Sequence, residues 1–158
     1  MIDPGQKAPD FDLPDHAGRR HTLAGLLREG PLILYFYPAD FTPVCTAQAC
    51  FFRDAASELA SAGLQVVGIS GQDGASHAQF REAHRLGFTL LADTGLTVTK
   101  AYGAIGLFGV LPFGLRRVTY LISRDGLVKD RLASDLRLAK HTEFVKRAIA
   151  TFAAARPH

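Results

Sequence analysis

Two cysteines, Cys45 and Cys50, are the residues of this sequence best suited to carry out chemistry. Cys45 follows Thr42 and Pro43 at the start of a predicted helix over residues 45–62, which contain no Gly or Pro before Gly63. A proline at the first helical position after a Thr cap places Cys45 in the first turn, with unpaired backbone N–H groups aimed at its sulfur. Helix N-termini and nearby cations favour the thiolate, the reactive form of cysteine. A cysteine in such an exposed turn is poorly placed as core filler, so Cys45 is a candidate nucleophile.

The spacing of the two cysteines restricts the bond that they could form. In an intact helix, Cα atoms five residues apart are separated by about 8.7 Å, whereas a disulfide needs about 4.4 to 6.8 Å. Cys45 and Cys50 could therefore bond only after one or two helical turns unwind. Two unrelated buried thiols remain an alternative, because free cysteine often fills a core. A metal site is less well supported, since four ligands are usual and no His lies near either cysteine in the sequence, and the four intervening residues do not fit a Cys-x-x-Cys redox motif.

Composition predicts a soluble globular protein. The chain has 158 residues, of which 47% are hydrophobic and 21% charged, which excludes a disordered chain and predicts a single domain over residues 1–158. The net charge of +3 comes from scattered basic residues, so nucleic-acid binding is not expected.

The longest apolar stretch is too short and too rich in glycine to span a membrane. The first residues lack a signal-peptide pattern, so we expect the cytoplasm, where disulfides are transient, and we expect no cofactor.

Hydrophobic patterning predicts strands that alternate with helices. Residues 31–37 form a continuous apolar and aromatic run, the pattern of a central strand buried on both faces. The sequence Ser76-x-x-Gln79 is typical of a capping box that opens a helix ending near Gly87. The further predicted elements are strands at residues 64–70, 88–92, 117–123 and 127–132, and helices at residues 96–102 and 140–154.

The order of these elements indicates the fold. A parallel βαβ core followed by an antiparallel hairpin and a final helix is the order that a thioredoxin-like domain uses. Asp125-Gly126, between the last two strands, is typical of a hairpin turn. We therefore predict an α/β, thioredoxin-like fold in which helices flank a central mixed sheet. It carries an N-terminal extension and a mid-chain insertion at the apolar residues 105–115.

One segment resembles a known family. Pro38-x-x-x-Thr42-x-x-Cys45, directly after Leu34-Tyr35-Phe36-Tyr37, resembles the active-site signature of the peroxiredoxins. Cys50, five residues further on, is similar to the bacterioferritin comigratory protein, or peroxiredoxin Q, branch. Collinear resemblance of this extent is much more specific than the lone signature. The other similar segments are residues 5–15, 52–54, 67–70, 76–77, 102–103 and 117–122.

The resemblance implies a thiol peroxidase that reduces hydrogen peroxide and organic hydroperoxides. In that case Cys45 is the peroxidatic cysteine, and Cys50 resolves it as an intramolecular disulfide that thioredoxin or a similar dithiol reduces. Thr42 is then a hydroxyl partner of the bound peroxide, Pro38 a shield for the sulfur, and Arg117 the cation near the thiolate. We expect a monomer or weak homodimer, although the sequence does not determine the oligomeric state.

Each supporting residue also has a purely structural interpretation. Thr42 could simply cap the helix, Pro38 could simply end the strand, and Arg117 could be a solvated residue at the start of a strand. His77 and His84 are predicted to lie on the surface or to pack on a helix, and we assign them no chemistry.

Three features depart from the branch that the sequence resembles. Val44 stands where Gly is usual, Gln48 stands where Glu is usual, and the apolar residues 105–115 replace a commonly more polar loop. Val44 could narrow access to Cys45, and the missing charge at Gln48 puts an electrostatic network around Arg117 in question. The apolar segment would favour hydroperoxides with apolar tails if it borders the Cys45 pocket. It could instead form an oligomer contact, or it could simply be buried against the core.

Two other functions fit the same residues. One is a thioredoxin-fold redox-sensing or protein-interaction module without significant peroxidase turnover. The other is a general thiol-disulfide oxidoreductase, which would reduce insulin disulfides and show no preference for peroxide. Steady-state consumption of peroxide in the presence of a dithiol separates the first from the peroxidase, and reduction of insulin disulfides identifies the second.

Overall fold

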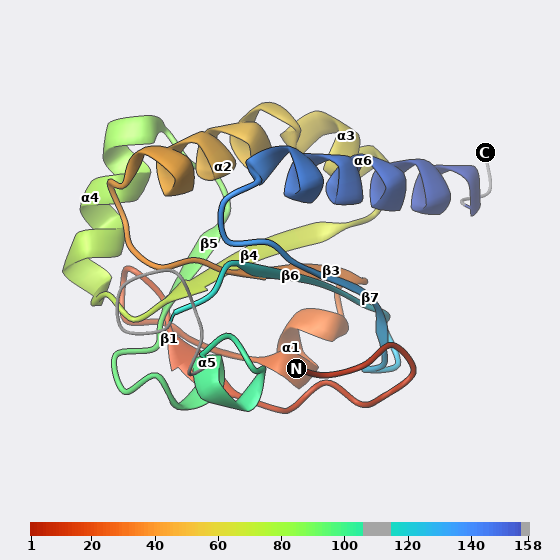
Figure 1. Ribbon diagram of the computed structural model, residues 1–158, viewed down its shortest axis with the longest axis horizontal. Coiled ribbons are helices and arrows are strands. Elements are labelled where there is room, and N and C mark those ends of the chain that lie inside the picture. Colours follow the sequence, from red (N-terminus) through yellow and green to blue (C-terminus); the bar gives the residue numbers. More distant parts are fainter. Residues whose placement is uncertain (106–114, 156–158) are drawn as a thin grey trace.

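A five-stranded mixed sheet forms the centre of the molecule (Figure 1). The computed structural model describes residues 1–105 and 115–155. The strands of this sheet are β3 (Leu32–Phe36), β4 (Gln65–Ser70), β5 (Thr89–Ala92), β6 (Val118–Ile122) and β7 (Val128–Ala133). Their order is β5-β4-β3-β6-β7; β3, β4 and β5 run parallel, and β6 pairs antiparallel with both β3 and β7. The predicted α/β fold with a central mixed sheet is confirmed.

Helices cover both faces of this sheet. Among the described elements, three helices lie on one face and two on the other, and a further helix packs against the edge strand β5, with its Phe80 in the core on the side of the three (Figure 1). The first group is α2 (Pro43–Asp54), α3 (Ala56–Ser61) and α6 (Leu138–Ala155), the second is α1 (Leu23–Leu27) and α5 (Thr97–Ala101), and the edge helix is α4 (Gly74–His84).

The N-terminal extension forms a short antiparallel hairpin of β1 (Asp12–Pro14) and β2 (Arg20–Thr22). Asp15 makes a backbone bridge to Leu91 of β5, which fastens this hairpin to the sheet. The sequence indicated an extension here but not its strands, because three residues are too few to show the alternation of a strand.

The long helix predicted over residues 45–62 is interrupted. Ala55 has φ −88° and ψ 4° and separates α2 from α3. Its N–H still donates to the Phe51 carbonyl, and its carbonyl accepts from Leu59 N–H. No Gly or Pro marks this position, so the local sequence carried no signal for the break. α2 begins at Pro43, the proline predicted at the first helical position.

The capping-box prediction for α4 is wrong. Asp73, not Ser76, is the N-cap, and its carboxylate accepts a 2.9 Å hydrogen bond from Ser76 N–H. The helix therefore begins at Gly74, and Ser76 lies inside its first turn. Asp is as good a cap as Ser, and here its side chain reaches the N–H three residues on. The Ser76 hydroxyl is thereby left for a different contact.

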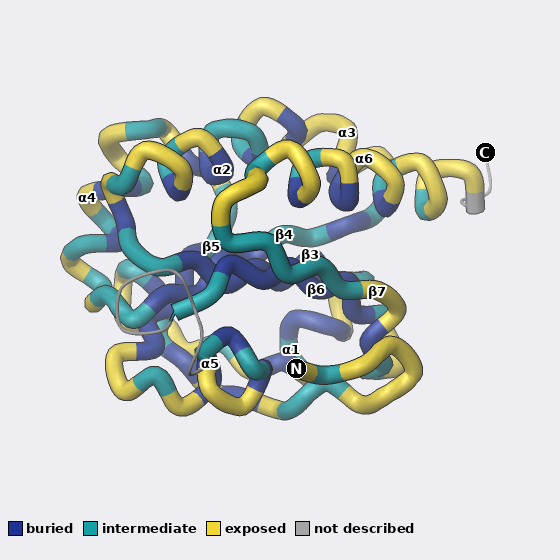
Figure 2. Tube along the Cα trace, in the orientation of Figure 1, coloured by how far each residue is buried: buried dark blue, intermediate teal, exposed yellow. Residues whose placement is uncertain are grey.

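Two cores, one on each face of the sheet, meet at β3. Leu34 faces the side of α1 and α5, and Tyr35 faces the side of α2 and α6. Figure 2 shows the buried residues concentrated in the sheet and on the inward sides of the helices. The ring of Tyr35 stacks on Phe52 of α2, with ring centroids 4.7 Å apart. This packing seats α2 on the central strand.

The predicted insertion is described only at its ends, where Ile105 and Leu115 form an antiparallel bridge. Residues 106–114, on which the prediction of an apolar substrate or oligomer surface depends, lie outside the described residues. Among the described helices, none is both long and apolar enough to cross a membrane.

Gly68→Ala is expected to destabilise the protein, because the sheet leaves no room for a Cβ at this position of β4. An ideal Cβ would lie 2.8 Å from Tyr35 Cζ and 2.9 Å from Leu90 Cδ2. Overpacking of this kind costs about 1–3 kcal/mol, so the midpoint of urea unfolding should fall. Gly87→Ala is the matched control, since nothing lies within 4 Å of its ideal Cβ. Equal midpoints for the two variants would contradict this packing argument.

Candidate active site

Cys45 lies in the first turn of α2, where the chain leaves the carboxyl end of β3. Thr42 occupies the N-cap position, Pro43 is the first helical residue and Cys45 is the third, so the predicted position of the cysteine is confirmed. Its predicted exposure is wrong. Cys45 is only 1% exposed, because it lies on the face of α2 that packs against the sheet. Burial by itself is what core filler would show, so the neighbours of the sulfur decide its role.

Arg117 provides the neighbour of greatest consequence. This residue directly precedes β6, whose Val118 pairs with Phe36 at the end of β3. The register brings the guanidinium under the start of α2, where Nη2 donates to Cys45 Sγ at 3.2 Å. Arg117 is 2% exposed, so its interpretation as a solvated strand-start residue is wrong. A buried cation in contact with a thiol stabilises the thiolate over the neutral form.

Gln48 keeps Arg117 in place although it lacks the charge of Glu. It lies one turn after Cys45 on the same buried face of α2, and its Oε1 accepts a 2.6 Å hydrogen bond from Arg117 Nη1. Within the described residues, Arg117 makes no ion pair with a carboxylate. Gln48 therefore holds the guanidinium with a neutral acceptor and does not offset its positive charge.

Thr42 stands at the N-cap position, but its hydroxyl does not cap the helix. Thr42 Oγ1 donates to the Ala39 carbonyl at 3.1 Å, and α2 has no side-chain cap. The structural interpretation of Thr42 as the capping side chain is therefore wrong. Its backbone carbonyl accepts from Thr46 N–H at 2.8 Å. The hydroxyl oxygen retains lone-pair capacity for a further hydrogen bond.

A cavity of about 510 Å³ opens beside this centre, and its walls include Pro38, Thr42 and Arg117. The structure thus brings three predicted site residues to one cavity. Cys45 does not line it; the sulfur lies behind the wall, in contact with Arg117. The apolar side chains among the lining residues are Pro38, Ala39, Pro43, Val44, Leu96, Leu115 and Leu136. The mostly apolar wall suits a small oxidant that carries an apolar group.

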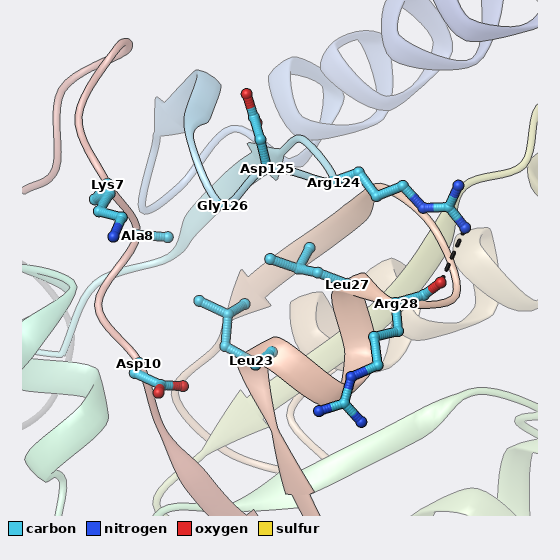
Figure 3. Close-up of a pocket in the computed structure, with 10 residues that line it drawn as sticks. Lys7, Ala8, Asp10, Leu23, Leu27, Arg28, Arg124, Asp125 and Gly126 are labelled. Carbon is cyan, nitrogen blue, oxygen red and sulfur yellow. Dashed lines mark hydrogen bonds between the residues drawn. The ribbon is translucent and has the colours of Figure 1, made fainter.

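A second cavity, of about 630 Å³, lies away from the cysteines, between residues 7–10, α1 and the turn at residues 124–126 (Figure 3). Its lining contains no cysteine or histidine. The guanidinium groups of Arg28 and Arg124 point in different directions, and Arg124 donates to the Arg28 carbonyl at 2.9 Å. Cavity size alone therefore does not identify the reactive centre.

Cys50 is partly exposed, and both cysteines are free thiols. α2 is regular from Pro43 to Asp54. The two cysteines are therefore more than one helical turn apart and lie on different sides of the helix. The structure therefore represents the reduced arrangement. Whether Cys50 resolves an oxidised Cys45 stays a prediction.

A buried polar network beside the loop at residues 38–42 was not foreseen. His77, predicted to lie on the surface or on a packed helix, is completely buried. Asp40 Oδ2 accepts from Ser76 Oγ at 2.8 Å and lies 2.7 Å from His77 Nδ1, and Oδ1 accepts from the Tyr37 hydroxyl at 2.6 Å. Burial, the adjacent Tyr35 and the Asp40 carboxylate raise the pKa of Tyr37 well above its usual value, so this hydroxyl stays a donor. Ser76 and His77 lie 36 and 37 positions after Asp40, and no local sequence pattern links them to it.

His84 packs on aromatic rings, with its ring centroid 5.2 Å from that of Phe80 and 6.2 Å from that of Phe41. It shares no hydrogen bond with the Asp40 network among the described contacts. In the described part of the chain, no group of three or more His, Cys, Asp or Glu side chains is arranged to hold a metal ion.

Comparison with known proteins supplies independent information. The family model AhpC/TSA matches residues 4–131. Peroxiredoxin Q of Arabidopsis thaliana chloroplasts is 43% identical over 143 residues, which cover 90% of this chain and 64% of that protein. The rice (japonica) chloroplast peroxiredoxin Q is 43% identical over 141 residues, covering 89% of this chain and 63% of that protein. This chain thus spans less than two thirds of these curated relatives.

Solved structures match nearly the whole chain. The peroxidoxin BcpB of Mycobacterium tuberculosis is 38% identical, covers 99% of this chain and 100% of its own, and superposes with a TM-score of 0.87. The bacterioferritin comigratory protein of Xanthomonas campestris is 27% identical, with 96% and 99% covered and a TM-score of 0.84. The chain therefore belongs to the AhpC/TSA family, in its peroxiredoxin Q and bacterioferritin comigratory protein branch.

Proposed function

We propose that this chain is a thiol-dependent peroxidase whose nucleophile is Cys45. The observation that carries the proposal is the 3.2 Å contact between Arg117 Nη2 and Cys45 Sγ at the start of α2. A docking module would not need a buried cation against the sulfur, whereas a thiol that attacks a peroxide is activated by one. A redox-sensing thiol would share this contact, so catalytic turnover separates it from the peroxidase. The test is steady-state consumption of hydroperoxide with a dithiol donor, which a sensing module would not sustain.

The chemistry of the first step suits this arrangement. The thiolate attacks one peroxide oxygen, the O–O bond breaks, and Cys45 becomes a sulfenic acid while the departing oxygen leaves as an alkoxide or hydroxide that takes up a proton. Negative charge grows on that departing oxygen in the transition state, so fixed donors near it lower the barrier. Arg117 and the free N–H groups at the start of α2 supply such donors, and the Thr42 hydroxyl lines the same cavity. Pro38 shields the sulfur from the solvent side.

The second step requires α2 to open. The sulfenic acid of Cys45 and the Cys50 thiol condense to a disulfide and release one water, but the regular helix holds their Cα atoms about 8.7 Å apart. Two features lower the cost of unwinding: the start of α2 has no side-chain cap, and its end is already interrupted at Ala55. Caps of this kind stabilise helices by about 0.5–2 kcal/mol. A dithiol of the thioredoxin type then reduces the disulfide to two thiols.

The substrate class follows from the cavity wall. Val44, Leu96 and Leu136 line it, and each CH₂ that a substrate buries there contributes about 0.8 kcal/mol. We therefore propose organic hydroperoxides in addition to hydrogen peroxide. The Xanthomonas campestris relative is described as having alkyl peroxide reduction activity, which supports this proposal.

Cys45→Ser is expected to abolish peroxide consumption, because a serine hydroxyl cannot replace the thiolate nucleophile. The measurement is loss of cumene hydroperoxide in the presence of thioredoxin, its reductase and NADPH. Urea unfolding of the variant checks that the loss is chemical, since the substitution changes one buried atom. Retention of most of the activity would exclude Cys45 as the nucleophile.

Cys50→Ser is expected to leave the first oxidation fast and to block the disulfide, because the second thiol is missing. Mass spectrometry after one equivalent of peroxide should detect Cys45 as sulfenic acid and, with excess peroxide, as sulfinic acid. Wild-type protein treated in parallel should contain the intramolecular disulfide instead. An unmodified Cys45 in the variant would argue against both assigned roles.

Arg117→Met is expected to lower the rate constant of Cys45 oxidation by about 10²-fold, the cost of removing one aimed donor from a site where charge develops. Met keeps the bulk of the side chain but not its charge. Stopped-flow oxidation of the reduced protein gives the rate directly. Arg116→Met is the matched control, because Arg116 is partly exposed and pairs with Asp135 at 3.6 Å rather than with the sulfur. Equal rates in the two variants would return Arg117 to a structural role.

A further inference from the structure

His77 lies at the centre of a contact between α4, the sheet and the loop at residues 38–42. Its side chain and that of Asp40 are both fully buried. Nε2 lies 3.0 Å from the Leu91 carbonyl of β5, and Nδ1 lies 2.7 Å from Asp40 Oδ2. A carbonyl oxygen only accepts, so Nε2 carries a hydrogen and donates it to β5. The ring thus connects the sheet to the loop that precedes α2.

The hydrogen bond between His77 and Asp40 is strong whether the imidazole or the carboxyl group formally carries the proton. In both cases one hydrogen lies between Nδ1 and Oδ2. The Tyr37 and Ser76 hydroxyls both donate to the same carboxyl group. Buried groups that satisfy one another in this way are costly to separate, because a lone partner would remain buried and unpaired.

The loop at residues 38–42 needs such support, because its backbone conformation is unfavourable. Phe41 has φ 66°, in the left-handed region that is unfavourable for a residue with a side chain. Its ring rests against Phe80 of α4, with ring centroids 5.2 Å apart. The Asp40 N–H donates to the Gln72 side-chain carbonyl, just before α4. Contacts with α4 and with Gln72 just before it therefore hold this loop in its conformation.

The same loop carries two of the residues assigned to the peroxide site. Pro38 and Thr42 lie two positions before and after Asp40, and Thr42 directly precedes α2. A displacement of Asp40 would therefore move the cavity wall and the start of α2 together. His77 has no hydrogen bond to either cysteine among the described contacts, so it can act on the chemistry only through its neighbours. Asp40, at 2.7 Å from Nδ1, is the nearest of these on the loop, and the Tyr37 hydroxyl lies 3.4 Å from the same nitrogen.

We propose that His77 is a positioning residue for the peroxidatic centre, which holds Pro38, Thr42 and the first turn of α2 through its hydrogen bond to Asp40. The inference rests on the proposed peroxidase function and extends it to a residue on a different helix. It assigns the two ring nitrogens different tasks: Nδ1 holds the reactive loop and Nε2 anchors the ring on β5.

Two substitutions separate these tasks. In His77→Asn the amide nitrogen can take the place of Nδ1 and keep the bond to Asp40, whereas in His77→Gln it can take the place of Nε2 and keep the bond to Leu91. Both variants lose the ring and one of its two hydrogen bonds. We expect the second-order rate constant of Cys45 oxidation to fall about tenfold in His77→Gln, equivalent to about 1.4 kcal/mol in the barrier. In His77→Asn it should stay within about threefold of the wild type.

The matched control is a second His–Asp pair in the same protein. His21 Nε2 lies 2.8 Å from Asp15 Oδ2 in the β1–β2 hairpin, and His21→Gln should leave the oxidation rate unchanged. Ser76→Ala removes the hydroxyl that donates to Asp40 from the partly exposed side of the network. If the His77 variants do not fold, this variant tests whether the contacts of Asp40 position the reactive centre. Its oxidation rate should fall below that of His21→Gln.

Hydrogen exchange provides the second measurement. The Thr46 amide, which donates to the Thr42 carbonyl, should exchange faster in His77→Gln than in His77→Asn. If both His77 variants lose equal rate, or neither does, His77 has only a structural role and the inference fails. A wild-type protein that peroxide does not oxidise at Cys45 would instead refute the proposed function itself.

Discussion

The contact between the Arg117 guanidinium and the Cys45 sulfur is the interaction on which the proposed chemistry depends. It exists only because β6 lies antiparallel beside β3 and because α2 is seated on β3 by its buried face. Burying a cation is costly unless it is hydrogen-bonded or paired. Gln48 satisfies one arm of the guanidinium and the sulfur another. In the proposed chemistry, a negatively charged sulfur is the partner that would pair the charge of the guanidinium.

α2 has to meet two opposing requirements. Its regular form places Cys45 against Arg117, but the same regularity keeps Cys50 out of bonding range. The buried face of the helix, stacked through Phe52 on Tyr35, holds the regular form. The uncapped start and the interruption at Ala55 weaken the helix at both ends. The balance between packing along one face and weak termini is the physical basis on which the helix can serve both steps of the proposed cycle.

The loop before α2 gains its order from outside itself. Asp40 and the left-handed Phe41 are held by contacts with α4 and the residues just before it. α4 is in turn fixed to the sheet by His77 and the Leu91 carbonyl. In the proposed site, the geometry at the sulfur has two separate supports, β6 through Arg117 and α4 through Asp40. The larger cavity near α1 shares neither support and contains no thiol.

The amino-acid sequence by itself determined most elements and the candidate nucleophile. The apolar run before Pro38, the Thr42-Pro43 start and the helical spacing after Cys45 are local patterns, and they located β3, α2 and the reactive first turn. Resemblance added Arg117, whose role no local pattern indicated. The sequence did not indicate that Asp73 rather than Ser76 caps α4, or that the long helix breaks at Ala55. Both outcomes depend on energy differences too small for local patterns to rank.

Only the tertiary structure decided which distant groups meet. Arg117 lies 72 residues from Cys45, and His77 lies 37 residues from Asp40. Propensity and periodicity act over one or two turns of chain, whereas these contacts arise from strand order and register. For the same reason the sequence suggested an exposed Cys45 and an unimportant His77. Whether these side chains are buried depends on how the helices pack on the sheet, and a single segment of sequence does not determine it.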